Sequence, residues 1–254
     1  MRIVTHTCSN TEIVCALGRG DWLVGVDDHS DHPPEIVHGL PRIGPDLDVD
    51  VERIRALKPD LVITSLTVPG HERCLERMQA ADLPLLVTCP HTLIDVADDI
   101  RRIGEAIDAT SKARRLADDF MATLNQRQPA ASPVPVLVEW WPKPVIVPGR
   151  KSWVNEMLEL AGAINPWAGK DVESLQIEPE QARKAAPEII IMSWCGVDES
   201  KYRPHVVRRR EGWETVPAVA GNRIHAVSEA WLGRPGPRLI EGIEKLRALV
   251  ASYQ

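Results

Sequence analysis

A proline that ends a helix, followed at once by an apolar strand, occurs twice in this chain of 254 residues. The two instances are residues 57–63 (LKPDLVI) and residues 185–191 (AAPEIII). Proline disfavours helix for the residue before it, and an unbroken apolar run is typical of a strand covered on both faces. Parallel strands of this kind need helical crossovers. The repeat therefore predicts one α/β architecture used twice.

Strand and helix patterns alternate through both halves of the chain. We expect strands at 2–5, 22–27, 60–64, 84–88, 135–139, 145–147, 188–192 and 223–227. We expect helices at 10–18, 49–57, 71–81, 152–161, 178–185, 205–210 and 236–251. Such alternation is typical of mostly parallel, Rossmann-like sheets.

Residues 92–128 interrupt this rhythm with helical stripes and no strand, and Thr110 or Ser111 is placed to cap a second helix there. The proline-rich stretch 129–135 then marks a boundary. We predict an N-terminal α/β lobe (1–110), a long linking helix (111–130) and a C-terminal α/β lobe (131–254). Strand ends from both lobes are expected to face a ligand cleft between them.

Composition excludes some classes of partner. A net charge of −6 argues against nucleic acid or an anionic membrane, and we expect Arg208-Arg209-Arg210 to be a solvated surface. No stretch approaches the length of a membrane helix, so we expect no direct membrane insertion. The five cysteines follow no disulfide or zinc spacing, which suits a reducing compartment or buried thiols.

Polar and aromatic residues collect where the predicted strands end. In the first 34 residues, the turns at 6–10 and 27–32 both follow strands, and Ser9 or Asn10 with Glu12 supplies helix-capping chemistry. Tryptophan is the favoured aromatic, with eight Trp against two Tyr and one Phe. Five of them follow predicted strands of the second half: Trp140, Trp141, Trp153, Trp194 and Trp231. This placement predicts a flat apolar ligand surface, with core packing as the alternative for about half of the indoles.

The chain resembles a known family along almost its whole length. The motifs that carry the likeness are Ser9 to Ile13, Ala16 to Gly18, Val24 to Val26, Ser30 to Pro34, Val51 to Ile54, Lys58 to Ile63, Gly149 to Ser152, Leu160 to Gly162, and Arg234 to Arg238. On these motifs it is similar to the helical-backbone (class III) substrate-binding proteins of ABC importers, which carry siderophores, haem or vitamin B12. Trp231, Arg234 and Pro237-Arg238 look most like the cobalamin-binding branch.

The resemblance implies a protein that is not an enzyme and has no intrinsic cofactor. It would capture a corrinoid, cobalamin or cobinamide, between its lobes and deliver it to an ABC permease dimer. The ligand-binding residues would be Ser9, Asn10, His29, His32, Ser65, Trp140, Trp141, Arg150, Ser152, Trp153, Trp194, Trp231 and Arg234. In the family a carboxylate on each lobe meets permease arginines, and the matching positions are Glu72 and Glu180. A first-turn Glu favoured by the helix dipole is the alternative for both.

The first lobe departs from the cobalamin-binding pattern. It has His29 and His32 where such proteins tend to carry Tyr, and Ser65 where they often show Trp. Neutral imidazole is a good ligand for cobalt and iron, so His29 and His32 are candidate axial ligands, followed by His6 and His91. Hydrogen-bonding loop residues are the alternative interpretation.

Other functions stay open at this point. A haem or ferric-siderophore binder of the same fold is the first alternative. A metal-dependent enzyme or a cytosolic metal or corrinoid carrier is the second, with acid and base groups drawn from Asp27, Asp28, His29, Asp31 and Glu139. Cys8 and Cys89 follow strands and are possible soft ligands, although a buried small hydrophobe is their commoner role.

The two lines of inference differ on the compartment. The resemblance implies a periplasmic or cell-surface protein. If Met1 is the natural start, the cysteine pattern and the lack of a leader favour the cytoplasm.

Overall fold

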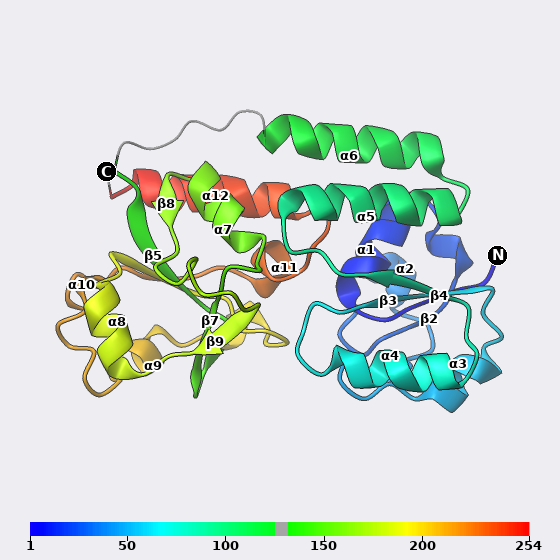
Figure 1. Cartoon of the computed structure of the whole chain (residues 1–254), viewed down its shortest axis with the longest axis horizontal. Helices are drawn as coiled ribbons and strands as arrows, with labels where there is room; N and C mark the ends of the chain where they lie inside the picture. Colours follow the sequence, from blue (N-terminus) through cyan, green and yellow to red (C-terminus); the bar gives the residue numbers. More distant parts are fainter. Residues whose placement is uncertain (125–131, 254) are drawn as a thin grey trace. The chain divides into compact units, whose positions relative to one another are not determined.

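The computed structural model describes residues 1–124 and 132–253, and the chain forms two compact units (Figure 1). Unit 1 comprises residues 1–90 and 94–121, and unit 2 comprises residues 91–93 and 122–254. Each unit is built around its own four-stranded parallel sheet. The predicted α/β class with two parallel sheets is confirmed.

The sheet of unit 1 contains the four strands predicted from the sequence, in the order β2-β1-β3-β4. Their bounds are β1 (Ile3–Thr5), β2 (Leu23–Val26), β3 (Leu61–Ser65) and β4 (Leu85–Thr88). The central strand β1 pairs with both β2 and β3, and Val4 lies opposite Val62. All strands run the same way, so their carboxyl ends lie along one edge of the sheet.

Helices cover both faces of this sheet (Figure 1). They are α1 (Cys8–Ala16), α2 (Pro34–Val37), α3 (Val51–Ala56), α4 (His71–Ala80), α5 (Leu93–Ala106) and α6 (Thr110–Leu124), with the short 3-10 helix η1 (Gly20–Trp22). On one face, Val4 and Val62 pack with Ile54 of α3 and Met78 of α4. Helices α1, α5 and α6 lie on the other face. Each strand is therefore apolar on both sides, as its sequence indicates.

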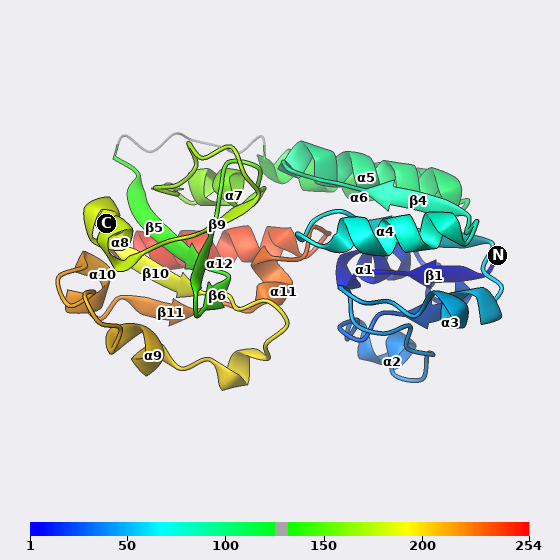
Figure 2. The ribbon, with the colours of Figure 1, turned by 60° about the horizontal axis from the view of Figure 1, so that its bottom comes forward.

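Unit 2 has a parallel sheet in the order β11-β10-β5-β8 and a small antiparallel sheet in the order β6-β7-β9. The strands are β5 (Val134–Glu139), β6 (Trp141–Pro142), β7 (Val145–Pro148), β8 (Ala163–Ile164), β9 (Ser174–Gln176), β10 (Ile189–Met192) and β11 (Ile224–Ala226). Strand β10 pairs with β5 from Ile189 opposite Val136 to Met192 opposite Glu139, and these strands lie side by side in Figure 2. Glu139 thus stands at the carboxyl end of the central strand pair.

The helices of unit 2 surround a core rich in indoles. They are α7 (Val154–Leu160), α8 (Pro179–Ala185), α9 (Pro204–Arg208), α10 (Pro217–Ala220), α11 (Glu229–Leu232) and α12 (Leu239–Ala251), with the 3-10 helix η2 (Glu199–Lys201). Leu137 and Ile190 of the sheet pack in one cluster with Trp167, Trp194 and Trp213. Core packing thus occupies several of the eight tryptophans.

The structure differs from the sequence prediction mainly in short elements and helix ends. The sequence did not predict α2, β6, β8, β9, α10 and α11, which have two to four residues each. Helix α1 begins at Cys8, with Thr7 at a positive φ of 79° as N-cap and no side-chain cap. The prediction that Ser9 or Asn10 caps this helix is therefore wrong. Residues 125–130 of the predicted linking helix lie outside the described residues.

Among the helices of the described residues, none combines the length and the apolar character needed to span a bilayer.

Close packing of α5 on α6 generates a stability prediction. A Cβ on Gly104 would lie 2.1 Å from the Cβ of Ala113. Alanine at a helical glycine ordinarily stabilises by up to about 1 kcal/mol. Here the overlap forces the helices apart, so we expect Gly104→Ala to lower the free energy of unfolding by about 1–3 kcal/mol in urea denaturation. The control is Gly39→Ala, because a Cβ there meets nothing within 4 Å. Equal stability of the two variants would contradict this packing.

Candidate functional site

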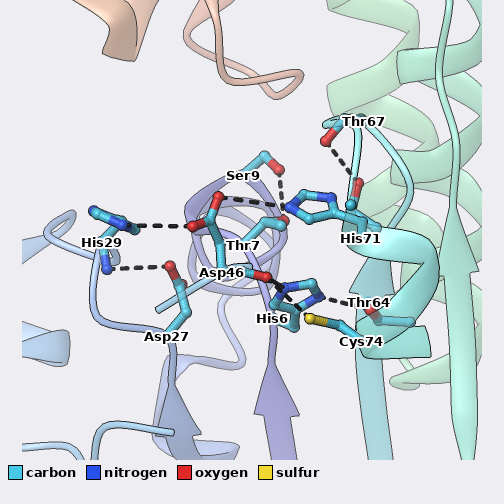
Figure 3. A network of polar contacts seen from close by, with 12 residues as sticks. His6, Thr7, Ser9, Asp27, His29, Asp46, Thr64, Thr67, His71 and Cys74 are labelled. Carbon is cyan, nitrogen blue, oxygen red and sulfur yellow. Dashed lines mark hydrogen bonds and ion pairs between the residues drawn. The ribbon is translucent and has the colours of Figure 1, made fainter. Parts of the chain in front are cut away.

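His6 follows β1 and is fully buried at the carboxyl edge of the unit 1 sheet (Figure 3). Its Nε2 lies 2.7 Å from the backbone carbonyl oxygen of Asp46, and its Nδ1 lies 2.7 Å from Oγ1 of Thr64. A carbonyl oxygen only accepts hydrogen bonds, so Nε2 carries the proton and Thr64 donates its hydroxyl to Nδ1. Both ring nitrogens are satisfied in the neutral form. His6 is therefore a structural link between β1, β3 and the loop that carries Asp46.

Burial makes this neutral form persistent. Burial, reinforced by the neighbouring His71, lowers the pKa of His6 from its ordinary value of 6.5 to about 4. The two rings meet edge to face with centroids 4.9 Å apart. His6 thus stays uncharged well below neutral pH.

Asp46 brings two further imidazoles together. Its Oδ2 lies 3.5 Å from Nε2 of the fully buried His71, and its Oδ1 lies 3.6 Å from Nε2 of His29. The contact with His71, together with the charge of His29, lowers the pKa of the Asp46 carboxyl. We call His6, His29, Asp46 and His71 the imidazole cluster. It lies entirely within unit 1 (Figure 3).

The turn that carries His29 is held by hydrogen bonds to Asp27 and from Arg42. The buried carboxylate of Asp27 accepts the hydroxyl of Ser30 and, at 3.1 Å, the backbone N–H of His29. The guanidinium of Arg42 donates to the carbonyl oxygens of Asp27 (2.9 Å) and Ser30 (2.6 Å). Burial raises the pKa of the Asp27 carboxyl, although the hydrogen bonds from Ser30 and His29 counter the effect. The His29 backbone is therefore fixed, while 43% of its side chain is exposed.

The other predicted residues of the first half fall into two groups. Ser9, Asn10 and Ser65 are buried. The Asn10 amide donates to the carbonyl oxygen of His6 at 3.0 Å, and Ser65 shares a 3.0 Å hydroxyl contact with Thr67, so both are tied to the fold. His32, by contrast, is exposed in the same turn as His29. A ligand-binding role for these residues stays a prediction.

No group of three His, Cys, Asp or Glu side chains is placed to hold a metal ion among residues 1–124 and 132–253. None of the five cysteines is in a disulfide bond, and Cys74 donates its thiol to the Asp46 carbonyl oxygen at 3.4 Å. A metal bound at His29 would therefore have to bring most of its own ligands.

Unit 2 presents a different chemistry at its strand ends. Glu139, at the end of β5, is fully buried and accepts the indole N–H of Trp194 at 2.9 Å. Arg210 donates to both oxygens of this carboxylate, at 2.7 and 3.2 Å. The expectation that Arg208-Arg209-Arg210 is a solvated surface is wrong for Arg210, whose side chain is only 13% exposed. Arg210 is drawn inward because the buried carboxylate of Glu139 needs a partner of opposite charge.

The five predicted indoles lie at different depths. Trp153 and Trp194 are 7% and 6% exposed, and Trp153 donates its indole N–H to the Leu232 carbonyl oxygen at 2.8 Å. Trp140 and Trp231 are half-buried, and the ammonium of Lys245 lies 3.9 Å from the ring centroid of Trp231. Trp141 is 40% exposed. It is the largest open aromatic surface of this group.

The predicted polar residues of unit 2 have partners of their own. Arg150 pairs with Asp171 on the surface, whereas Arg234 is buried and its Nε lies 3.3 Å from Glu229. Ser152 is buried. Two residues that the sequence analysis missed organise this region: the Asn155 amide donates to the carbonyl oxygens of Gly149, Arg150 and Ser152, and the Asn165 amide donates to those of Pro148 and the Asn155 side chain. Asn155 lies within α7, and the two-residue strand β8 before Asn165 was not predicted, so the strand-end rule could not find either residue.

The two predicted permease contacts are both exposed first-turn residues. Glu72 accepts the backbone N–H of Gly70 at 2.8 Å, and this bonding lowers the pKa of its carboxyl. Glu180 pairs with Arg183 one turn later and is 79% exposed. A local contact in the first helical turn and an open carboxylate are thus compatible at both positions.

Asp46 and His71 were also missed by the sequence analysis. Asp46 lies in the loop between α2 and α3, and His71 is the first residue of α4. A Pro-Asp turn signal at 45–46 was the available clue to Asp46.

The buried neutral His6 predicts a pH dependence of stability. The unfolded chain binds a proton on this imidazole near pH 6.5, whereas the folded chain does so only near pH 4. Acidification across this interval therefore favours unfolding, by up to about 3 kcal/mol from this residue. We expect urea denaturation, followed by circular dichroism, to show this loss in the wild type and a smaller loss in His6→Gln. His38→Gln, at an exposed position, is the control, and an unchanged slope in His6→Gln would contradict the assignment.

Comparison with known proteins places this geometry in a family. The periplasmic binding protein family matches residues 3–229. An uncharacterized ABC transporter substrate-binding lipoprotein of Bacillus subtilis is 32% identical over 96% of this chain and 78% of its own length.

Two solved structures share the fold across nearly the whole chain. The periplasmic vitamin B12 binding protein of Vibrio cholerae has a TM-score of 0.81 at 26% identity, covering 99% of this chain and 96% of that one. The periplasmic heme-binding protein of Roseiflexus sp. RS-1, in its apo form, has a TM-score of 0.84 at 30% identity, covering 99% and 98%.

The match over residues 3–229 and the likeness to the Bacillus protein agree with the two α/β units and their polar strand ends. This chain belongs to the periplasmic binding protein family and is a substrate-binding protein of the ABC-transporter type.

Proposed function

We propose that this protein binds a corrinoid, cobalamin or cobinamide, and delivers it to an ABC importer outside the cytoplasmic membrane. The likeness to the vitamin B12 binding protein of Vibrio cholerae over 99% of the chain carries this proposal. The indoles at the strand ends of unit 2 support it, because a flat, largely apolar ring system is well matched by aromatic surface. Trp141, with its 40% exposed indole, is the first contact we assign.

The polar contacts follow from the same proposal. Trp140, Trp153, Trp194 and Trp231 complete the aromatic surface in our assignment, and Ser9, Asn10, Ser65, Arg150, Ser152 and Arg234 position the ligand's amide groups. Several of these side chains are buried: Ser9, Asn10, Ser65, Ser152, Trp153, Trp194 and Arg234. In our proposal the buried side chains act indirectly, by holding in place the exposed residues that touch the ligand.

A second candidate ligand is haem. The heme-binding protein of Roseiflexus is 30% identical to this chain, and the imidazole cluster offers a nitrogen donor suited to iron. We propose His29 as the axial donor to either metal, ahead of His32, because Asp46 and the Asp27 turn hold His29 in place.

Ligand identity is tested by absorbance titration with cobalamin, cobinamide, haem and a ferric hydroxamate. We expect a corrinoid to bind more tightly than about 10 μM, or roughly 7 kcal/mol. Trp141→Ala should weaken corrinoid binding about 5- to 10-fold through lost stacking, while its thermal unfolding stays unchanged. Tighter binding of haem than of any corrinoid would move the assignment to the second candidate, and no binding of any of the four would remove both.

Delivery to the importer is tested at the exposed carboxylates. We propose that Glu72 and Glu180 meet basic residues of the permease dimer. Glu72→Arg and Glu180→Arg should each reduce ligand uptake several-fold in cells that carry the importer, because a like charge now faces the permease. Ligand affinity of the purified variants should not change. Glu76→Arg, at an exposed position one turn later on α4, is the matched control, and an equal loss in this variant would contradict a specific role for Glu72.

A further inference from the structure

Asp46 is immobilised by three buried side chains. Its backbone carbonyl oxygen accepts His6 Nε2–H at 2.7 Å and the Cys74 thiol at 3.4 Å. Its carboxylate Oδ2 lies 3.5 Å from His71, which is fully buried. Both the backbone and the side chain of Asp46 are therefore held by groups that do not reach solvent (Figure 3).

The second carboxylate oxygen faces an imidazole that does reach solvent. Oδ1 lies 3.6 Å from Nε2 of His29, and no described residue hydrogen-bonds Nδ1 of this ring. The side chain is 43% exposed. One ring nitrogen thus points at a fixed carboxylate, while the other has no protein partner within the described part of the chain.

This arrangement decides which nitrogen can ligate. A carboxylate beside Nε2 favours the tautomer with the proton on Nε2, which leaves the lone pair on Nδ1. Metal-bound histidines commonly donate their other N–H to a carboxylate, which orients the ring and raises its basicity. The present 3.6 Å is longer than a hydrogen bond, so the carboxylate steers the ring electrostatically, and the exposed His29 side chain can close the gap when a bound cation polarises its ring.

We propose that Asp46 is a positioning residue that presents Nδ1 of His29 to one open axial position of a chelated metal. The inference rests on the proposed function, in which the ligand carries its own metal. The step is a ligand exchange: the bond from the metal to an axial water breaks, the Nδ1 lone pair forms the new bond, and water leaves. The metal is neither oxidised nor reduced, and the imidazole keeps its Nε2 proton.

The other histidines of the cluster have different tasks. His6 uses both ring nitrogens within unit 1, and His71 is fully buried. His29 is therefore the imidazole of this cluster that reaches solvent, and no group of three ligating side chains lies among the described residues. A single donor matches a metal whose remaining positions are filled by a macrocycle.

The test compares two probes that differ only in their axial ligands. Diaquacobinamide has exchangeable axial waters, whereas dicyanocobinamide in excess cyanide does not. We expect the wild type to convert diaquacobinamide to an imidazole-ligated spectrum, and His29→Ala to abolish that change. Asp46→Asn should weaken diaquacobinamide binding 10- to 100-fold and leave dicyanocobinamide binding unchanged. Asp28→Asn removes the same charge from the residue next to His29 and should behave as the wild type.

Retained binding of dicyanocobinamide shows that Asp46→Asn is folded, and Asp46→Glu, which keeps the carboxylate, should recover part of the spectral change. An equal loss for both probes, or no loss for either, would overturn the positioning role. Binding of both probes by the wild type without any spectral change would overturn it as well, while leaving the carrier function intact. If the wild type binds neither probe, the corrinoid function itself fails. Iron(III) protoporphyrin and metal-free protoporphyrin then provide the same comparison for a haem carrier.

Discussion

Parallel strand pairing brings the carboxyl ends of the strands to one edge of each sheet, and the arrangement of polar residues in both units depends on it. A strand covered on two faces stays apolar until its last residues, so polar side chains appear only where it ends. In unit 1, the apolar Ile3 and Val4 of β1 give way to Thr5 at the strand end and to His6 just beyond it, and in β3 Ile63 gives way to Thr64. Because these ends share one edge, His6 meets Thr64 across 58 positions of sequence. The imidazole cluster is a consequence of this pairing.

The main strands could be predicted because their signals are local. An apolar run after a proline identifies β3 and β10 without any knowledge of what covers them. Elements of two to four residues, such as β6, β8 and α11, are too short to show a period, and tertiary contacts decide them. The start of α1 was misplaced for a related reason: the Asn10 amide donates back to the carbonyl oxygen of His6 and to Thr7, so it closes the turn from inside the helix. Capping propensity alone does not reveal that bond.

The sequence predicts where along the chain the candidate site residues lie, but not which of their side chains are buried. The strand-end rule finds His6 and His29, yet it passes over Asp46 and His71, which follow no strand. The same rule places Trp153 and Trp194 correctly along the chain without showing that they are buried. Their burial depends on partners for the indole N–H, the Leu232 carbonyl oxygen and the Glu139 carboxylate, which only the folded chain brings near.

In unit 1 an exposed imidazole is backed by buried groups, whereas in unit 2 a buried charge pair holds an indole of the core. Asp46, anchored by His71, lies behind His29 in unit 1, and in unit 2 the Glu139–Arg210 pair fixes Trp194 within the core that adjoins the strand ends. Buried partners of this kind are costly to exchange, because removing one leaves the other unpaired. Exposed groups such as His29 and Trp141 carry no such penalty. In the proposed function, a change of ligand would therefore involve a few exposed residues such as these while the buried anchors persist.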